Sequence, residues 1–337
     1  MLSPFTFVGS RTLQAPPLKA GVWRLSLLGV ALAGLVTPLP AQGPTMVHRE
    51  AQANGIKLHY AQSGAGPLIL FLHGFPEFWY AWKDQLAEFG RDHLAVAPDQ
   101  RGYNLSEKPT ALDAYRIAEL VEDVRALAAN LNGGQPFVLV GHDWGGVVAW
   151  AFAIKHPALL KKLVIINAPH PAVFERELAN NPAQQKASQY MLFFRSPGAE
   201  AALAADNYAA LLRVFEPPRQ LGKFTADDDR AYVQAWSQPG ALTGGLNYYR
   251  AARVGPPGGQ GTVAATEALA TRDVVVRTPT LVIWGERDDA LLTGNLLGLD
   301  AFVPQLTIKR IPAGSHWVVH EFAAEVNGLI REFLREP

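Results

Sequence analysis

Residues 137–146 read FVLVGHDWGG, and this stretch decides the fold. Its first four residues form a continuous apolar run, which indicates a buried β-strand. A glycine-rich turn follows, and the residues after the turn carry a helical pattern that ends before Pro157. A sharp strand-to-helix turn needs small neighbours if its central side chain is to stand clear of the backbone. The stretch therefore predicts that the carboxylate of Asp143 projects from the end of a buried strand.

Outward from this turn, the chain alternates short apolar runs with helical periods. Asn54 and Gly55 separate two short runs and favour a β-hairpin. Further strands are expected at residues 68–72, 94–97, 163–166, 281–284 and 306–311, and helices at 117–131 and 322–333. Buried apolar strands separated by helices are typical of a parallel sheet that is covered on both faces. The sequence thus predicts an α/β fold with a mostly parallel central sheet.

The alternation stops between about residues 172 and 272, where the sequence is rich in Ala and aromatic residues and has no strand-like run. Thr225 followed by three Asp residues is typical of the start of a helix. We therefore expect a helical cap inserted into the sheet-containing core. The expected boundaries are residues 46–172 for the first part of the core, 173–271 for the cap and 272–337 for the second part.

The composition excludes several classes of protein. The 337 residues are 49% hydrophobic, which is enough for a large core and excludes a disordered chain. The 30 basic and 30 acidic residues give no net charge, so we expect neither a nucleic-acid partner nor a stable membrane partner. The absence of Cys excludes disulfides, thiolate nucleophiles and Cys-ligated zinc.

The first 41 residues resemble a signal peptide. Arg24 precedes an uncharged apolar run over residues 25–36, and small residues and prolines follow. The run has about 12 residues, whereas a membrane-spanning helix needs roughly 20. We expect residues 1–41 to be a signal peptide and the mature protein to be periplasmic or secreted. Because the stretch before the run is long for such a leader, a true start near Val22 or at Met46 is the alternative, and a misplaced start would make the protein cytoplasmic.

Asp143 is a candidate nucleophile. The turn has the pattern of a nucleophile elbow, with Asp at the position where a hydrolase often carries Ser. A carboxylate there can attack carbon and form an ester, and the following helix N-terminus favours its anionic form. The alternative is that Asp143 only caps the helix.

Two further groups follow in the order nucleophile, acid, His. Residues 284–289 (WGERDD) come after a strand, so their carboxylates lie at the carboxyl edge of the sheet, where such folds place their sites. His316 follows the last expected strand and can take a proton from water, while Asp288 orients its imidazole ring. Asp289 is the alternative orienting acid. These partners favour catalysis over a capping role for Asp143.

Residues 73–77 (HGFPE) follow another expected strand and complete the predicted site. The backbone N–H groups of Phe75 and Trp144 would bind the oxyanion that forms when water attacks an ester carbonyl. His73 and His142 lie beside these donors and are expected to support the site.

These motifs together resemble those of the α/β-hydrolase superfamily and, more narrowly, its epoxide hydrolases, which are close to the haloalkane and fluoroacetate dehalogenases. The resemblance covers roughly residues 47–337 and includes residues 99–106 (DQRGYNLS). It implies the α/β-hydrolase fold. Residues 189–194 and 247–250 resemble the cap segments that carry the two ring-opening tyrosines of epoxide hydrolases, which assigns that role to Tyr190 and Tyr249.

The implied reaction converts a small apolar epoxide and water to a vicinal diol, without a cofactor or metal. Asp143 would open the ring, and His316 with Asp288 would activate water to cleave the resulting ester. A phenol has a pKa near 10, so it is neutral at pH 7 and can donate its proton to the epoxide oxygen. An aromatic pocket is expected from His73, Phe78, Trp79, Trp82, Phe193 and Phe194, although each aromatic residue could be plain core.

Two other functions remain as alternatives. A dehalogenase of the same fold would use Asp143 but would hold a departing halide, and Trp144 matches one halide-binding position of haloalkane dehalogenases. Phe75, however, has no side-chain hydrogen-bond donor, whereas some haloalkane dehalogenases have Asn at this position. Fluoroacetate dehalogenases carry Arg directly after the nucleophile, where this chain has Trp144. A non-catalytic binding protein of the same fold should have lost part of the triad, whereas Asp143, Asp288 and His316 are all present.

Overall fold

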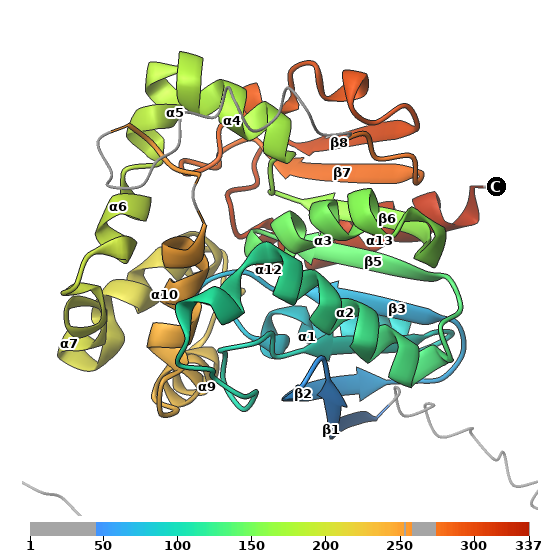
Figure 1. Cartoon of the computed structure of the whole chain (residues 1–337), viewed down its shortest axis with the longest axis horizontal. Helices are drawn as coiled ribbons and strands as arrows, with labels where there is room; N and C mark the ends of the chain where they lie inside the picture. The colour runs from blue at the N-terminus through green and yellow to red at the C-terminus, as the bar shows by residue number, and fades with distance from the viewer. Residues whose placement is uncertain (1–44, 253, 258–273, 337) are drawn as a thin grey trace, which may run out of the picture. The chain divides into compact units, whose positions relative to one another are not determined.

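The computed structural model describes residues 45–252, 254–257 and 274–336. The predicted signal peptide and much of the predicted end of the cap therefore lie outside the described residues. The strands are β1 (Met46–Ala53), β2 (Ile56–Ser63), β3 (Leu68–Leu72), β4 (Leu94–Pro98), β5 (Phe137–His142), β6 (Leu160–Ile166), β7 (Thr280–Gly285) and β8 (Leu306–Ile311). They form one sheet in the order β1-β2-β4-β3-β5-β6-β7-β8 (Figure 1).

The sheet is mostly parallel, as the sequence predicts. Strands β3 to β8 pair in parallel, while β2 pairs antiparallel with both β1 and β4. The turn between β1 and β2 holds Asn54 at φ +48° and Gly55 at φ +78°. Two successive left-handed residues are what a tight two-residue hairpin turn requires, so the Asn-Gly prediction is confirmed.

Alternating side chains of the buried strands build a separate core on each face of the sheet. In β3, Leu70 and Leu72 pack on the same side as helices α2 (Ile117–Asn132) and α3 (Trp144–Lys155). Ile69 and Phe71 pack on the opposite side, with helices α1 (Lys83–Phe89) and α13 (Ala323–Arg335). Burying a side chain of this size contributes about 1.5–3 kcal/mol. This two-sided burial explains why the strands read as continuous apolar runs.

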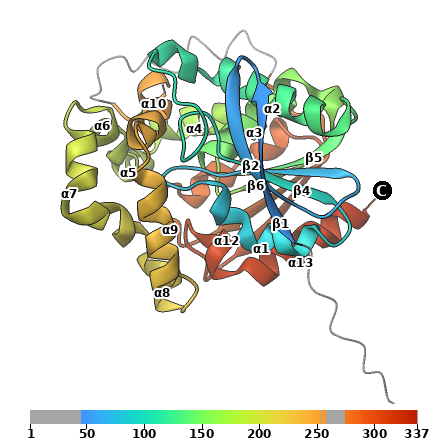
Figure 2. The ribbon, with the colours of Figure 1, turned by 90° about the horizontal axis from the view of Figure 1, so that it is seen from below.

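Between β6 and β7 the chain leaves the sheet and forms a series of helices. These are α4 (Pro171–Asn180), α5 (Pro182–Ala187), α6 (Tyr190–Arg195), α7 (Ala199–Leu212), α8 (Glu216–Gln220), α9 (Ala226–Trp236) and α10 (Ala241–Ala251). The helices lie beyond the end of the sheet where the parallel strands finish (Figure 1), and Figure 2 shows α6 to α10 gathered on that side. We call α4 to α10 the helical insertion. Its described part contains no strand, in agreement with the sequence.

The predicted helix start at Thr225 is confirmed. The side chain of Thr225 accepts a hydrogen bond from the backbone N–H of Asp228, whose carboxylate accepts one from the N–H of Thr225 over 2.7 Å. This reciprocal arrangement is a capping box at the start of α9. Among all the helices that the structure describes, none is both long and apolar enough to cross a lipid bilayer.

Candidate active site

Asp143 occupies the sharp turn between β5 and α3. Its backbone has φ +50° and ψ −123°, a conformation that residues other than Gly rarely adopt. The turn is also crowded, because a Cβ on Gly145 would lie 2.1 Å from the carbonyl oxygen of Leu72. Small residues at this position are therefore a steric requirement, as the sequence predicts. The carboxylate of Asp143 is nearly buried at the carboxyl edge of the sheet.

The two carboxylate oxygens of Asp143 have different neighbours. Oδ1 accepts a hydrogen bond from the backbone N–H of Phe75 over 2.8 Å. Oδ2 lies 3.7 Å from Nε2 of His316. Trp144 is the first residue of α3, and the first N–H groups of a helix have no acceptor within the helix. Both predicted oxyanion donors therefore lie beside Asp143.

The imidazole of His316 links Asp143 to Asp288. Its Nδ1 lies 2.7 Å from Oδ2 of Asp288, and its Nε2 is directed toward Asp143. Burial alone would lower the pKa of His316, but the adjacent carboxylates of Asp288 and Asp143 outweigh it and raise this pKa to about 9. Burial likewise opposes ionisation of Asp288, yet the contact with His316 holds the pKa of Asp288 below its ordinary value.

Asp288 rather than Asp289 is the acid on His316. Asp288 is buried, and its Oδ1 accepts hydrogen bonds from the backbone N–H groups of Ala290 and Leu291 over 2.9 and 2.8 Å. Asp289 is exposed to solvent. The sequence alone could not decide which of these two acids contacts His316, because it does not define the directions in which neighbouring loop residues point.

Asn167 is a functional neighbour that the sequence analysis did not select. It follows β6 directly, and its Nδ2 donates to Oδ2 of Asp288 over 2.7 Å. Its Oδ1 accepts a hydrogen bond from the backbone N–H of Gly285 over 2.8 Å. A polar residue at the end of a buried parallel strand was the signal that could have identified it.

Tyr190 and Tyr249 come from the helical insertion and meet over the site. Tyr190 begins α6 and Tyr249 lies near the end of α10, and their ring centroids are 6.1 Å apart. The ring of Tyr249 also packs edge-on against Phe75, at 5.6 Å, and Trp144, at 5.1 Å, the two residues with the predicted oxyanion donors. The insertion therefore brings both phenols next to the nucleophile turn.

Both phenols are held in the protonated state. Burial raises the pKa of Tyr190 and that of Tyr249 well above the ordinary value, and the carboxylate of Asp143 raises both further. A hydrogen bond with Trp144 opposes this effect at Tyr249. A neutral phenol near a carboxylate can donate to a developing alkoxide.

A buried polar network lies behind His316. The carboxylate of Glu77 contacts Nδ1 of His142 at 3.2 Å and Nε2 of His320 at 2.6 Å, and it accepts a hydrogen bond from the hydroxyl of Tyr232 at 3.1 Å. Nε2 of His142 donates to the carbonyl of His316 over 2.8 Å. Burial opposes ionisation of Glu77, but the two histidines hold its pKa below the ordinary value. The network supports the backbone of His316, and the sequence indicated only its His142 member.

The comparisons with known proteins agree with this architecture. Residues 67–323 match the protein family described as the alpha/beta hydrolase fold. The chain belongs to this α/β-hydrolase family. The fold class predicted from the sequence is therefore confirmed.

Relatives of this α/β-hydrolase carry more specific names. The AB hydrolase superfamily protein YfhM of Bacillus subtilis is 40% identical over 84% of this chain and 96% of its own length. Epoxide hydrolase 4 of Mus musculus is 36% identical over 84% of this chain and 77% of its own length. The crystal structure of Bacillus megaterium epoxide hydrolase in complex with an inhibitor is 38% identical, with a TM-score of 0.80 over 86% of this chain and 100% of that chain. The resemblance to epoxide hydrolases that the motifs indicated is confirmed.

Two residues that the sequence placed in a substrate pocket are instead buried in the α/β-hydrolase core. His73 is fully buried, and its ring nitrogens contact the carbonyl of Gly74 and the backbone N–H of Gln100. His73 therefore holds the loop that carries Phe75 and does not face a substrate. Trp82 is fully buried in the core on the opposite face of the sheet. Its assignment to the pocket was wrong, because its ring packs against Phe71 of β3 on that face, with centroids 5.3 Å apart, and not toward the site.

The other aromatic residues that were predicted to line the pocket lie in different surroundings. The ring of Trp79 packs against His48 of β1, and that of Phe78 against Tyr232 of α9, so both lie in packing clusters. Phe193 is 42% exposed to solvent. Its neighbour Phe194 instead contacts the rings of Phe75, Tyr190 and Tyr249. Phe194 is thus the predicted aromatic residue that lines the site.

Within the residues that the structure describes, no group of three or more His, Asp or Glu side chains is arranged to hold a metal ion.

Proposed function

We propose that this protein is an epoxide hydrolase, which converts a small apolar epoxide and water to a vicinal diol through an ester on Asp143. The names of its relatives support this proposal. The observation that carries it is the position of the Asp143 carboxylate, which has His316 at 3.7 Å and two protonated phenols nearby. A nucleophile, a base and an acid therefore meet in one buried site.

In the first step, Oδ2 of Asp143 attacks an epoxide carbon, while Oδ1 stays on the N–H of Phe75. The bond between that carbon and the ring oxygen breaks, and the oxygen takes a proton from Tyr190 or Tyr249. An alkoxide is a poor leaving group, so this proton is what makes the ring opening feasible. General acid catalysis of this kind contributes on the order of 10²–10⁴-fold.

In the second step, His316 removes a proton from water, and the resulting hydroxide attacks the ester carbonyl of Asp143. The oxyanion that forms on Oδ1 is held by the N–H groups of Phe75 and Trp144. When this intermediate collapses, the bond between Cγ and Oδ2 of Asp143 breaks, and the departing diol oxygen takes the proton that His316 removed from water. The proton left on the Asp143 carboxyl group returns to the tyrosinate, which restores both the carboxylate and the phenol. Esterification removes the negative charge of Asp143, one of the three carboxylates that raise the pKa of His316, so the ring becomes a more available base when the ester needs it.

The helical insertion acts as a cap in this scheme, and this role is part of the proposal. It supplies both phenols, while the core supplies the nucleophile and the base. It also packs aromatic rings such as Phe194 against the site, which restricts entry of water and favours an apolar substrate.

A dehalogenase reaction is the second candidate, because Trp144, which directly follows the nucleophile, matches one halide-binding position of haloalkane dehalogenases. A halide leaves without a proton and is bound by N–H donors. An alkoxide must be protonated as it leaves, and the two phenols can supply that proton, so they favour an epoxide substrate. A panel of an aryl epoxide and a haloalkane separates the candidates. The proposal expects diol from the epoxide and no halide release, and the opposite pattern contradicts it.

The decisive test traps the ester. His316→Gln removes the base of the second step but keeps Asp143, so styrene oxide should add its mass to the intact protein. The adduct should be absent from the double variant His316→Gln/Asp143→Ala. No adduct with any epoxide would contradict the mechanism.

We extend the proposal to export of the protein with residues 1–41 as a signal peptide. Its support is Arg24 followed by the uncharged run at residues 25–36. N-terminal sequencing of the native protein should give a start at or near Gln42. A start at Met1 or Met46 would contradict export by this segment.

A further inference from the structure

We infer that Arg195 is a positioning residue that sets the separation of the two ring-opening phenols. This inference rests on the proposed epoxide hydrolase function. Arg195 is the last residue of α6, the short helix that Tyr190 begins. Its Nε donates to the backbone carbonyl of Tyr249 over 2.8 Å, so one side chain joins the helix of the first phenol to the backbone of the second.

Arg195 makes this contact as part of a three-carbonyl clamp. A second guanidinium nitrogen donates to the carbonyls of Ala252 and Val254 over 3.2 and 2.5 Å. The last carbonyl groups of a helix accept no hydrogen bond from within the helix. A positive charge near them is favourable, because the helix dipole is negative at this end. The guanidinium therefore caps the end of α10 while it fixes α6 in place.

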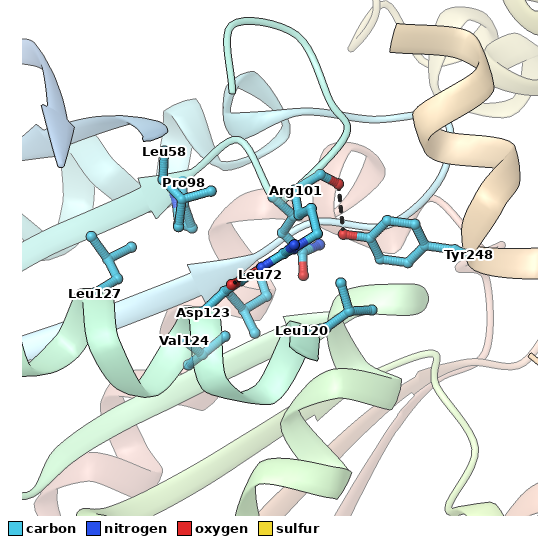
Figure 3. A pocket seen from close by; sticks show the side chains of 10 residues that line it. Leu58, Leu72, Pro98, Arg101, Leu120, Asp123, Val124, Leu127 and Tyr248 are labelled. Carbon is cyan, nitrogen blue, oxygen red and sulfur yellow. Dashed lines mark hydrogen bonds and ion pairs between the residues drawn. The ribbon is translucent and has the colours of Figure 1, made fainter. Parts of the chain in front are cut away.

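Helix α10 is itself fastened to the core, so Tyr249 has a fixed position. The backbones of Gly244 and Gly102 touch, since a Cβ on Gly244 would lie 2.1 Å from the carbonyl oxygen of Gly102. The hydroxyl of Tyr248 donates to the carbonyl of Arg101 over 3.0 Å, as Figure 3 shows. Arg101 is in turn held by a buried ion pair with Asp123, beside a small apolar pocket.

Helix α6 is attached differently. In the described part of the chain, the side-chain hydrogen bonds from α6 to other elements come from Arg195. The neighbouring Arg250 of α10 pairs with Glu200 of α7 and makes a longer hydrogen bond, over 3.3 Å, to the carbonyl of Ser196, the residue that caps the end of α6. Ring packing of Phe194 against Tyr190 and Tyr249 holds α6 near α10, and Arg195 adds the hydrogen bond that ties α6 to the backbone of Tyr249 itself.

The separation of the phenols matters because both must reach one oxygen atom. An O–H···O hydrogen bond requires 2.5–3.0 Å between oxygens, so a shift of about 1 Å in α6 removes one of the two donors. Misplacement by that amount costs a reaction up to about 100-fold. The base and its acid come from the core, so the second step should not depend on Arg195.

The test is a single-turnover experiment with styrene oxide that measures ester formation and ester hydrolysis separately. Arg195→Met keeps the length of the side chain and removes the donors, and it should slow ester formation about tenfold or more while ester hydrolysis changes less than about twofold. Arg195→Lys keeps a charge and a donor, should fold even if the Met variant does not, and should recover part of the rate.

Arg219→Met is the matched control, because Arg219 binds Asp229 within the same insertion through two hydrogen bonds, away from the phenols. It should lower the melting temperature without slowing ester formation. If Arg195→Met instead lowers only the melting temperature, or slows both chemical steps equally, the inference is overturned.

A double-mutant cycle with Tyr190→Phe isolates positioning from general damage. Once the Tyr190 hydroxyl is gone, adding Arg195→Met should cost less than about twofold more in ester formation. Fully additive losses would overturn the inference. Wild-type protein that forms no ester with any epoxide would overturn the proposed function, and this inference with it, whereas wild-type esterification unaffected by Arg195→Met would overturn the inference alone.

Discussion

The backbone N–H of Phe75 donates a hydrogen bond to Oδ1 of Asp143 over 2.8 Å. This contact makes the two oxygens of the carboxylate unequal before any substrate binds. Oδ1 is held where an oxyanion would form, and Oδ2 is left as the attacking atom. The loop that carries Phe75 is therefore as important for the direction of attack as the nucleophile turn itself.

The first prediction concerns Gly74, which precedes Phe75 in this loop. A Cβ on Gly74 would lie 2.2 Å from Oδ1 of Asp143, far closer than an unbonded carbon and oxygen can approach. Gly74→Ala should therefore displace the carboxylate and reduce kcat about 100-fold or more. Steady-state kinetics with styrene oxide measures this effect.

Gly328→Ala is the control for that prediction. Gly328 lies inside α13, where an added Cβ has no neighbour within 4 Å, so the substitution should leave kcat unchanged and stabilise the helix by up to about 1 kcal/mol. Equal activity of the two Ala variants would contradict the crowding argument.

The second prediction compares two adjacent tyrosines of α10. Tyr249→Phe removes a proton donor from the site and should slow diol formation about tenfold or more. Tyr248→Phe removes the hydrogen bond to the carbonyl of Arg101 and should cost about 1 kcal/mol of stability. The close contact of Gly244 with Gly102 still fastens α10, so ring opening should slow much less than in Tyr249→Phe. Product assays and thermal unfolding of both variants separate the effects. Near-normal turnover in Tyr249→Phe, in Tyr190→Phe and in the double variant would remove both phenols from the mechanism.

The third prediction concerns Asn167, which positions the acid of the His316 pair. Asn167→Ala leaves the backbone N–H of Gly285 without its partner and removes the hydrogen bond that Oδ2 of Asp288 accepts beside His316, at a cost of about 1–3 kcal/mol. Ester hydrolysis should slow because the imidazole of His316 is less well oriented, while ester formation should change little. An effect on ester formation alone would show that Asn167 acts elsewhere.

The fourth prediction follows from the raised pKa of His316. Because this pKa rises from 6.5 to about 9 on folding, the folded protein keeps a proton that the unfolded chain releases between these values. The resulting stabilisation is complete below about pH 6.5 and is lost as the pH rises through about 9. The difference in melting temperature between wild type and His316→Gln should therefore shrink from about pH 6 to about pH 9.5. A difference that grows with pH would contradict the assigned charge state.

The core of the site could be predicted because its residues follow strands. Asp143, Asp288 and His316 each come after an apolar run, and parallel strands bring their carboxyl ends to one edge. The order of the runs and the tight turn were enough to group these three residues without a structure.

The pocket could not be predicted in the same way. Sequence places Trp79 and Trp82 next to the site loop, but their rings turn into packing clusters that depend on distant strands and helices. Asn167 was missed because its role depends on the neighbouring strand β7, which comes more than a hundred residues later. Contacts between elements far apart in the chain leave no local pattern.

The central claim is that Asp143 becomes esterified to the substrate, and a single turnover in H₂¹⁸O tests it most directly. With enzyme in excess, the first diol should contain unlabelled oxygen, and mass spectrometry should find ¹⁸O in the peptide that contains Asp143. A first diol that carries the label, with none in that peptide, would contradict the account.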